Sequence, residues 1–83
     1  MTYFVYLIGN YRGSKLITYI GYTNNLKKRV KSHNSGKGAK FTRGKNWELI
    51  YHEKYQTRKE AMFRESYLKN NRKLRNFIKN KYK

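Results

Sequence analysis

A predicted junction between a strand and a helix constrains the fold more than any other feature of the chain. The run Leu16–Ile20 is typical of a strand, because it is apolar and rich in β-branched and aromatic residues. Asn24 follows at a position from which its side chain can cap a helix. Leu26 and Val30 are four residues apart, so they share one face of that helix. We therefore expect a helix over about residues 25–33 with an inward-facing apolar stripe.

Two side chains suited to chemistry lie beside that stripe. Arg29 and His33 are also four residues apart and are therefore neighbours on the helix surface. They fall on the apolar flank, whereas Lys27 and Lys31 fall on the opposite side. A cation and a titratable imidazole on an inward flank, just after a strand that carries Tyr19, indicate part of a functional site. Taken singly, each has an ordinary interpretation, Arg29 as a solvated cation and His33 as a residue favoured by the helix dipole.

The chain before this junction predicts a hairpin. In residues 2–9, the side chains expected on either face of a strand are apolar or aromatic. This pattern is typical of a strand that is covered on at least one face and partly on both. Gly9–Ser14 is rich in turn-forming residues, and a second strand over about 15–21 follows closely enough to pair antiparallel with the first. Tyr6 and Tyr19 then lie on adjacent strands, and the register that decides whether they share a face is left open. Core tyrosines with bonded hydroxyls are the ordinary alternative for both.

The second half of the chain completes the sheet and adds two helices. Trp47–Tyr55 alternates as a third strand. Thr57–Glu60 has the capping-box pattern, which begins a second helix that we expect to run to about Asn70. Asn71 can cap a third, amphipathic helix. The order β-β-α-β-α-α predicts an α/β fold of the α+β type, with helices packed on a three-stranded sheet in one domain over residues 2–81.

The charge of the chain indicates its partners. Twenty-one Lys and Arg residues oppose four acids, all Glu, for a net charge of +17 that is spread over the whole chain. Such a field favours polyanions, and together with nine tyrosines it makes nucleic acid the first candidate partner. A membrane surface is not expected, because no predicted helix joins a basic face to a broad apolar one. The same charge disfavours self-association, so we expect a monomer.

The absence of cysteine excludes a disulfide framework and a Cys-based zinc site. The first residues lack the basic region of a signal peptide, and no apolar run approaches the length of a membrane span. We therefore expect an intracellular, cytoplasmic protein, associated with the nucleoid if it binds DNA.

A basic, glycine-rich loop over residues 36–45 separates the first predicted helix from the third strand. It is not a phosphate-binding P-loop, because five residues rather than four separate Gly38 from Gly44, and Lys45 is not followed by Ser or Thr. One interpretation is a mobile, solvated connector. The other is a nucleic-acid clamp, whose cations bind phosphates while a ring stacks or anchors; its candidates are Lys37, Lys40, Phe41, Arg43 and Lys45.

Glu65 is the carboxylate best placed for a site. On the second predicted helix it shares the stripe of Ala61 and Leu68, which is the stripe expected to pack on the sheet. A carboxylate that faces inward must be paired, protonated or bound to a metal ion. An ion pair with Arg29 or another cation and a metal site both remain open. Because the chain has only four carboxylates, a metal site would hold one Mg²⁺ through one Glu and mostly through water and phosphate oxygens.

The predicted hairpin strands carry two short motifs. Val5–Tyr6 stands where the first motif of the GIY-YIG nuclease family places Ile-Tyr, although Phe4 replaces its Gly. Tyr19–Gly21 is the second motif, Tyr-Ile-Gly, unchanged. Residues 36–43 are similar to the small, stand-alone bacterial and viral branch of that family, close to the catalytic module of structure-specific nuclease subunits. The chain therefore resembles this family.

Three further residues carry the resemblance. Arg29 lies ten residues past the second tyrosine, as the helix arginine of the family does. His33 follows where members carry His or Tyr, and Glu65 stands at the helix position of the metal-binding Glu. The resemblance covers about residues 3–80, and its elements occur in the same order and at matching spacing.

The resemblance implies a metal-dependent DNA endonuclease or nickase that hydrolyses phosphodiester bonds with water and one Mg²⁺ or Mn²⁺ ion, which Glu65 would hold. It implies the catalytic residues Tyr6, Tyr19, Arg29, His33 and Glu65. The general base stays open between either tyrosine and the histidine. The expected DNA contacts are Tyr22, which stands where many members have Lys, and the loop residues Lys37, Lys40, Phe41 and Arg43.

The expected substrate is DNA, branched or nicked, with a protein partner as a source of specificity. The alternative is a basic nucleic-acid-binding module with the same fold, which does not cleave or cleaves only with a partner. A basic structural protein of the ribosomal kind is a third class, but it gives no reason for the ordered Tyr, Arg, His and Glu.

Overall fold

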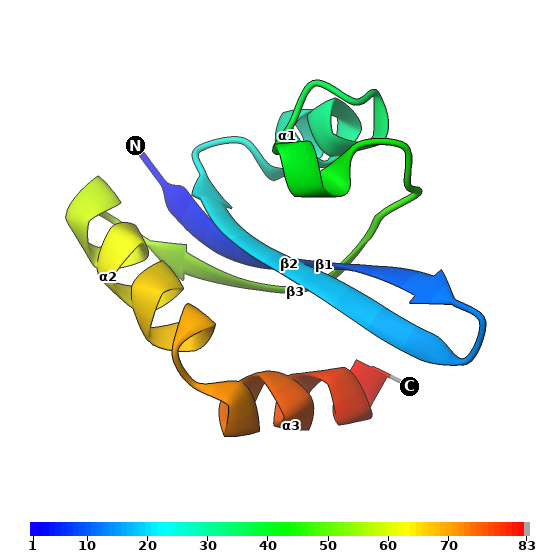
Figure 1. The fold of residues 1–83 in the computed structure, drawn as a ribbon. Coiled ribbons are helices and arrows are strands. Elements are labelled where there is room, and N and C mark those ends of the chain that lie inside the picture. Colours follow the sequence, from blue (N-terminus) through cyan, green and yellow to red (C-terminus); the bar gives the residue numbers. More distant parts are fainter. Residues whose placement is uncertain (83) are drawn as a thin grey trace.

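The computed structural model describes residues 1–82 and arranges them in three layers. A three-stranded antiparallel sheet lies in the middle, with one helix and a loop on one face and two helices on the other (Figure 1). The elements are β1 (Tyr3–Arg12), β2 (Lys15–Thr23), α1 (Leu26–Asn34), the 3₁₀ helix η1 (Lys40–Thr42), β3 (Glu48–Tyr55), α2 (Arg58–Lys69) and α3 (Arg72–Tyr82). The predicted order β-β-α-β-α-α is confirmed. Within the described residues, none of these helices is both long enough and apolar enough to cross a membrane.

The hairpin of β1 and β2 is longer than predicted. β1 is the central strand, so β2 and β3 form the two edges of the sheet. The turn predicted over residues 9–14 is wrong in length, because the two strands stay paired up to Arg12 and Lys15. Gly9 lies inside β1, where the side chain of Leu16 packs against it. That glycine therefore marks a tightly packed strand position rather than a turn.

The helix α1 begins one residue later than predicted and has a different cap. Asn25, not Asn24, is the cap residue, and its Oδ1 accepts a hydrogen bond of 3.1 Å from the backbone N–H of Lys28. The cause is that β2 continues through Thr23, whose Oγ1 accepts a hydrogen bond of 3.1 Å from the backbone N–H of Asn25. The predicted inward stripe of α1 is confirmed, since its apolar side chains pack against the sheet.

The main core lies on the other face of the sheet, under α2 and α3. Its buried members are Val5, Leu7, Ile20, Ala61, Leu68 and Ile78. The predicted capping box starts α2: Thr57 Oγ1 accepts from the backbone N–H of Glu60, and the Glu60 carboxylate accepts from the backbone N–H of Thr57. Asn71 Oδ1 accepts a hydrogen bond of 3.0 Å from the backbone N–H of Leu74, so the predicted cap of α3 is also confirmed.

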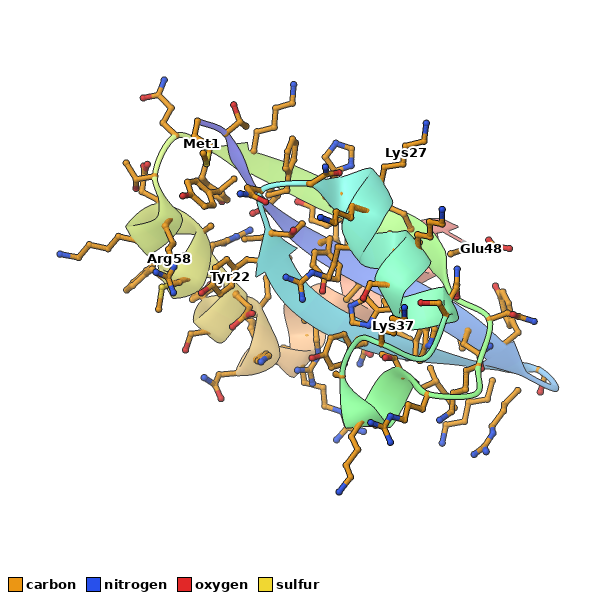
Figure 2. All side chains as sticks on the ribbon, turned by 90° about the horizontal axis from the view of Figure 1, so that it is seen from above. Met1, Tyr22, Lys27, Lys37, Glu48 and Arg58 are labelled. Carbon is orange, nitrogen blue, oxygen red and sulfur yellow. The ribbon has the colours of Figure 1, made fainter. Side chains whose placement is uncertain are left out.

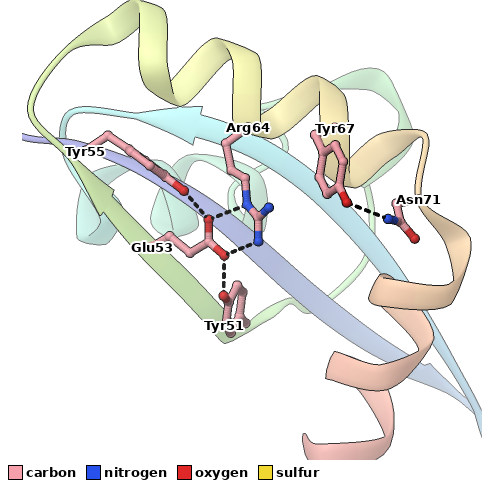
Figure 3. Close-up of polar contacts among 6 residues, drawn as sticks. All are labelled: Tyr51, Glu53, Tyr55, Arg64, Tyr67 and Asn71. Atoms are coloured by element: carbon pink, nitrogen blue, oxygen red, sulfur yellow. Dashed lines mark hydrogen bonds and ion pairs between the residues drawn. The ribbon is translucent and has the colours of Figure 1, made fainter.

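Glu53 accepts four hydrogen bonds, two of which join β3 to α2 and two of which come from β3 itself (Figure 3). Arg64 donates two of them, from Nε to Oε1 at 2.8 Å and from Nη2 to Oε2 at 3.0 Å. The hydroxyl of Tyr55 donates to Oε1 at 2.6 Å, and the hydroxyl of Tyr51 donates to Oε2. Burial raises the pKa of the Glu53 carboxyl, but these hydrogen bonds outweigh burial and lower the pKa from 4.5 to about 2. The Glu53 carboxylate therefore has a structural role, because it links β3 to α2 through Arg64.

We expect Glu53→Gln to remove an acid-sensitive part of the stability of the fold. Because the pKa of Glu53 is lower in the folded chain, its contribution is present above pH 4.5 and is lost as the pH falls toward about 2. That contribution is on the order of 2 kcal/mol. Urea unfolding at several pH values checks this: the free energy of unfolding should fall more steeply in this range for wild type than for the variant. Equal slopes in both proteins would contradict the assignment.

Candidate active site

A hollow of about 520 Å³ opens at the β2 edge of the sheet. We call it the edge hollow; its lining includes Tyr6, Tyr19, Tyr22, Arg29, Arg58 and Glu65. Arg29 comes from α1 on one face of the sheet, whereas Arg58 and Glu65 come from α2 on the other. In Figure 2, Tyr22 and Arg58 lie side by side at this edge, and Arg58 Nε donates a hydrogen bond of 3.4 Å to the Tyr22 hydroxyl. The edge hollow therefore straddles the edge strand.

The two candidate strand tyrosines share one face of the sheet. Tyr6 pairs with Gly21 and Ile8 pairs with Tyr19, and paired residues of an antiparallel sheet point to the same side. Both rings lie on the α1 side. Gly21 is required there, because a Cβ at this position would lie 2.4 Å from the Tyr6 hydroxyl oxygen. The glycine of the Tyr-Ile-Gly motif thus leaves space for the Tyr6 ring.

A chain of three hydrogen bonds runs inward from the Tyr6 hydroxyl. This hydroxyl lies 2.8 Å from His33 Nε2, and His33 Nδ1 lies 2.9 Å from Thr42 Oγ1. Thr42 Oγ1 in turn donates to the Ala39 carbonyl at 2.8 Å. Because the threonine proton is used by that carbonyl, Thr42 accepts from Nδ1–H, which leaves Nε2 as the acceptor for the Tyr6 proton. The network therefore assigns the tautomer of His33 and the direction of each bond.

The inner side of the basic loop is built around the His33 ring. Thr42 is completely buried, and a Cβ at Gly38 would lie only 2.3 Å from His33 Nδ1. Trp47 Nε1 donates a hydrogen bond of 2.9 Å to the Thr42 carbonyl. Asn34 holds the far end of the loop, since its amide exchanges two hydrogen bonds with the backbone of Trp47, of 2.6 and 3.0 Å. The loop is therefore anchored, and its interpretation as a loose connector is wrong for this part.

The ionisation of the Tyr6–His33 pair follows from burial. Burial raises the pKa of the Tyr6 hydroxyl; Arg29 opposes this rise, and Tyr19 and Glu65 add to it. Burial lowers the pKa of the His33 imidazole below 6.5, and the nearby charge of Arg29 lowers it further. At neutral pH the hydroxyl thus keeps its proton and the imidazole is uncharged, as the hydrogen-bond directions require.

Arg29 and Glu65 bring opposite charges to the edge hollow from opposite faces of the sheet. Arg29 is exposed and its guanidinium offers a planar fork of donors. Glu65 belongs to the helix that covers the face opposite Tyr6, yet it lines the same hollow because β2 is an edge strand. Its carboxylate pairs with Lys69 Nζ at 3.6 Å, one turn along α2, and its side chain keeps 20% of its surface exposed. The ion-pair partner of Glu65 is therefore Lys69.

The number of carboxylates available in the described residues indicates which kind of metal ion the edge hollow could bind. No group of three or more His, Cys, Asp and Glu residues that could hold a metal occurs within residues 1–82. Of the glutamates in that range, Glu65 is the one that lines the edge hollow, and Glu53 is occupied by Arg64 and two tyrosines. A single carboxylate beside open space suits a hard cation such as Mg²⁺, which keeps several water ligands. It does not suit zinc, which takes three or four protein ligands.

Of the residues predicted to contact DNA, one lines this hollow. Tyr22 lines it directly. Phe41 lies beside it: half of this side chain is exposed, and its ring stacks on Tyr19 with centroids 6.0 Å apart and planes 21° apart. The remaining predicted contacts are exposed cations of the loop, Lys37, Lys40 and Arg43. Arg58 and Thr42 were not among the predicted site residues, and no periodic pattern marks either of them.

We expect Thr42→Val to change the protonated nitrogen of His33. Valine has a similar shape but cannot accept a hydrogen bond, so Nδ1–H would lose its buried partner, at a cost of about 1–3 kcal/mol. The Nε2–H tautomer should then gain population and displace the Tyr6 hydroxyl bond. The ¹⁵N chemical shifts of the His33 ring, compared with His52 as an internal reference, report the tautomer. Thr42→Ser should keep the wild-type shifts, and unchanged shifts in Thr42→Val would contradict the assigned direction.

Comparison with known proteins gives one family and a set of relatives named UPF0213 proteins. Residues 2–83 match the family described as the GIY-YIG catalytic domain. The UPF0213 protein CPE1444 of Clostridium perfringens is 52% identical over 52 residues, which are 61% of this chain and 56% of that protein. The UPF0213 protein YazA of Bacillus subtilis is 56% identical over 52 residues, which are 61% of this chain and 52% of that protein. These matches thus span about half the length of both relatives.

A solved structure extends the similarity to most of the fold. The solution NMR structure of the UPF0213 protein BH0048 from Bacillus halodurans matches with a TM-score of 0.54 and 35% sequence identity. The match covers 94% of this chain and 82% of that protein.

Proposed function

This chain belongs to the GIY-YIG catalytic domain family, and on that basis we propose that it is a metal-dependent DNA endonuclease or nickase. The family and the fold are of the nuclease type, whereas the names of the UPF0213 relatives state no activity. One observation carries the proposal. The hydroxyl of Tyr6, whose proton is directed to His33, lines the same hollow as the Arg29 guanidinium and the Glu65 carboxylate.

In this proposal, basic side chains and a metal ion bind the DNA phosphate and stabilise the charge that builds on it. The net charge of +17 draws the polyanion, and Arg29 binds a phosphate with two parallel N–H donors. As the attacking oxygen adds to phosphorus, charge builds on the non-bridging oxygens, and the same guanidinium stabilises it. When held at Glu65, a hydrated Mg²⁺ or Mn²⁺ ion supplies polarisation of the phosphate and stabilisation of the leaving oxygen.

Proton transfer falls to the Tyr6–His33 pair. Both side chains are buried, Tyr6 at 2% and His33 at 1% exposure, but Tyr6 lines the edge hollow and His33 does not. We therefore assign Tyr6 as the immediate base: its oxygen takes a proton from the attacking water, and its own proton passes to His33 Nε2. The imidazolium that forms keeps its Nδ1–H on Thr42. The water oxygen bonds to phosphorus as the bond to the leaving oxygen breaks, and the leaving oxygen takes a proton from solvent water.

The test of this proposal is a cleavage screen over a panel of DNA structures. Intact duplex, nicked duplex, flapped, branched and single-stranded substrates are incubated with protein and Mg²⁺ or Mn²⁺, with EDTA in parallel. Strand cleavage that requires the metal is the expected result on at least one member of the panel. No cleavage of any member by folded, monodisperse protein would overturn the proposal.

One observation favours a second candidate, a basic nucleic-acid-binding module that does not cleave or that needs a protein partner. Within residues 1–82 the edge hollow has a single carboxylate, and this carboxylate is paired with Lys69. Tight, salt-dependent binding of DNA without cleavage in the same screen would support this candidate.

A further inference from the structure

We propose that a second groove, between β2 and α3, binds a single-stranded arm of DNA that continues from the edge hollow. The groove has a volume of about 490 Å³. We call it the basic groove; the residues of its lining that carry the inference are Tyr19, Phe41, Lys69, Arg72, Arg75 and Lys79. The inference rests on the proposed function, and it adds the part of the substrate that the protein holds outside the reacting phosphate.

The basic groove continues the edge hollow along the same strand. Tyr19 lines both, so the two spaces meet at this residue. On β2 the basic groove is lined by residues 18–20, and the edge hollow by Tyr19 and residues 21–23. Lys69 also links the two, because its side chain lines the groove while its ammonium pairs with Glu65. A strand whose phosphate lies in the hollow therefore meets the groove next.

The charge of the groove matches a phosphate backbone. Arg72 and Lys79 are seven residues apart on α3 and so lie on one face of the helix, toward the groove. Within the described residues, no carboxylate contributes to this lining. Arg75 is already engaged, since its guanidinium donates to the carbonyls of Leu68 and Lys69 at the end of α2. Arg72 is exposed and Lys79 half-buried, and these two are the phosphate ligands we assign.

The aromatic side of the groove indicates an unpaired strand. Phe41 stacks on Tyr19 but keeps half of its surface exposed, and Lys45 Nζ lies 5.3 Å from its ring centroid. A nucleobase can stack on the Phe41 ring only if one face of the base is free. Bases inside an intact duplex have both faces covered by their neighbours in the stack. A single-stranded arm meets this requirement.

The test compares binding of two oligonucleotide duplexes of equal charge, one with a single-stranded arm and one blunt. Fluorescence anisotropy is measured without divalent metal, so the result does not depend on cleavage. Wild type should prefer the armed duplex. Arg72→Gln/Lys79→Gln should weaken that binding about tenfold or more and lower the slope of log affinity against log salt by about 2. Phe41→Ala should weaken it about tenfold and leave the slope unchanged.

A matched control separates this groove from general charge. Lys73→Gln/Lys81→Gln removes the same charge from exposed positions of the same helix that do not line the groove. This control should lower the affinity for both duplexes by the same small factor. Equal losses in the two double variants, or no preference of wild type for the arm, would overturn the inference. Cleavage without arm preference would refute the groove alone, whereas arm preference without cleavage would refute the nuclease alone.

Discussion

Replacing Glu65 with Gln is expected to lower the rate of metal-dependent DNA cleavage at least about 10³-fold while leaving DNA affinity unchanged or slightly higher. Within the described residues Glu65 is the carboxylate that lines the edge hollow, so no second protein ligand replaces it. The lost stabilisation of phosphate charge is worth several kcal/mol, and each 1.36 kcal/mol is about tenfold in rate. Affinity for DNA should not fall, because the change removes a negative charge from a cationic surface.

Single-turnover cleavage over a series of Mg²⁺ concentrations, with binding measured in EDTA, checks this prediction. The matched control is Glu60→Gln, which makes the same change on the same helix. Glu60 forms the capping box of α2, and glutamine is compatible with that motif. The control should cleave like wild type. Cleavage by Glu65→Gln at the wild-type rate would remove the metal site from the mechanism.

The second large effect is expected from Tyr6→Phe, which should lower the cleavage rate about 10²- to 10⁴-fold. Phenylalanine fills the same space beside Gly21 but cannot pass a proton to His33. The pH profile of wild type should agree with this role. His33 accepts the proton only when it is neutral, and its pKa lies below 6.5. The cleavage rate should therefore stay constant as the pH is lowered to about 6.5, and it should decrease at lower pH.

Two further tyrosine variants make the Tyr6 result specific. Tyr19→Phe asks whether the other tyrosine of the edge hollow transfers the proton; on our assignment it should lose much less activity than Tyr6→Phe. Tyr11→Phe changes an exposed tyrosine at the far end of the hairpin and should leave the rate unchanged. A Tyr6→Phe variant that cleaves faster than Tyr19→Phe would reverse the assignment.

The local parts of the fold were predictable from residue types and spacing. A Thr-x-x-Glu pattern starts α2, and Asn71 caps α3, because these caps depend on side chains within a few residues of each other. The errors lie where tertiary pairing decides. β2 continues through Thr23 because it pairs with β1, and this pairing moves the cap of α1 from Asn24 to Asn25.

The candidate site was predictable as a set of residues but not as an arrangement. The side on which Tyr6 and Tyr19 lie depends on a register that no single strand encodes. Thr42 is polar and stands in a basic loop, where nothing in the pattern marks it as buried under His33. Glu53 and Glu65 are both glutamates on regular elements. Only the packing of α2 on the sheet decides that Glu53 pairs with Arg64 and that Glu65 lines the edge hollow.

The position of the hollow across the edge strand means that no fragment without α2 holds all the side chains of the proposed site. The hairpin and α1 supply the hydroxyl, the imidazole and the guanidinium, but the carboxylate arrives only with α2, from the opposite layer. On the proposed function, cleavage therefore requires α2 to be packed on the sheet. A chain folded only as far as α1 would be a polycation that lacks the carboxylate of the site.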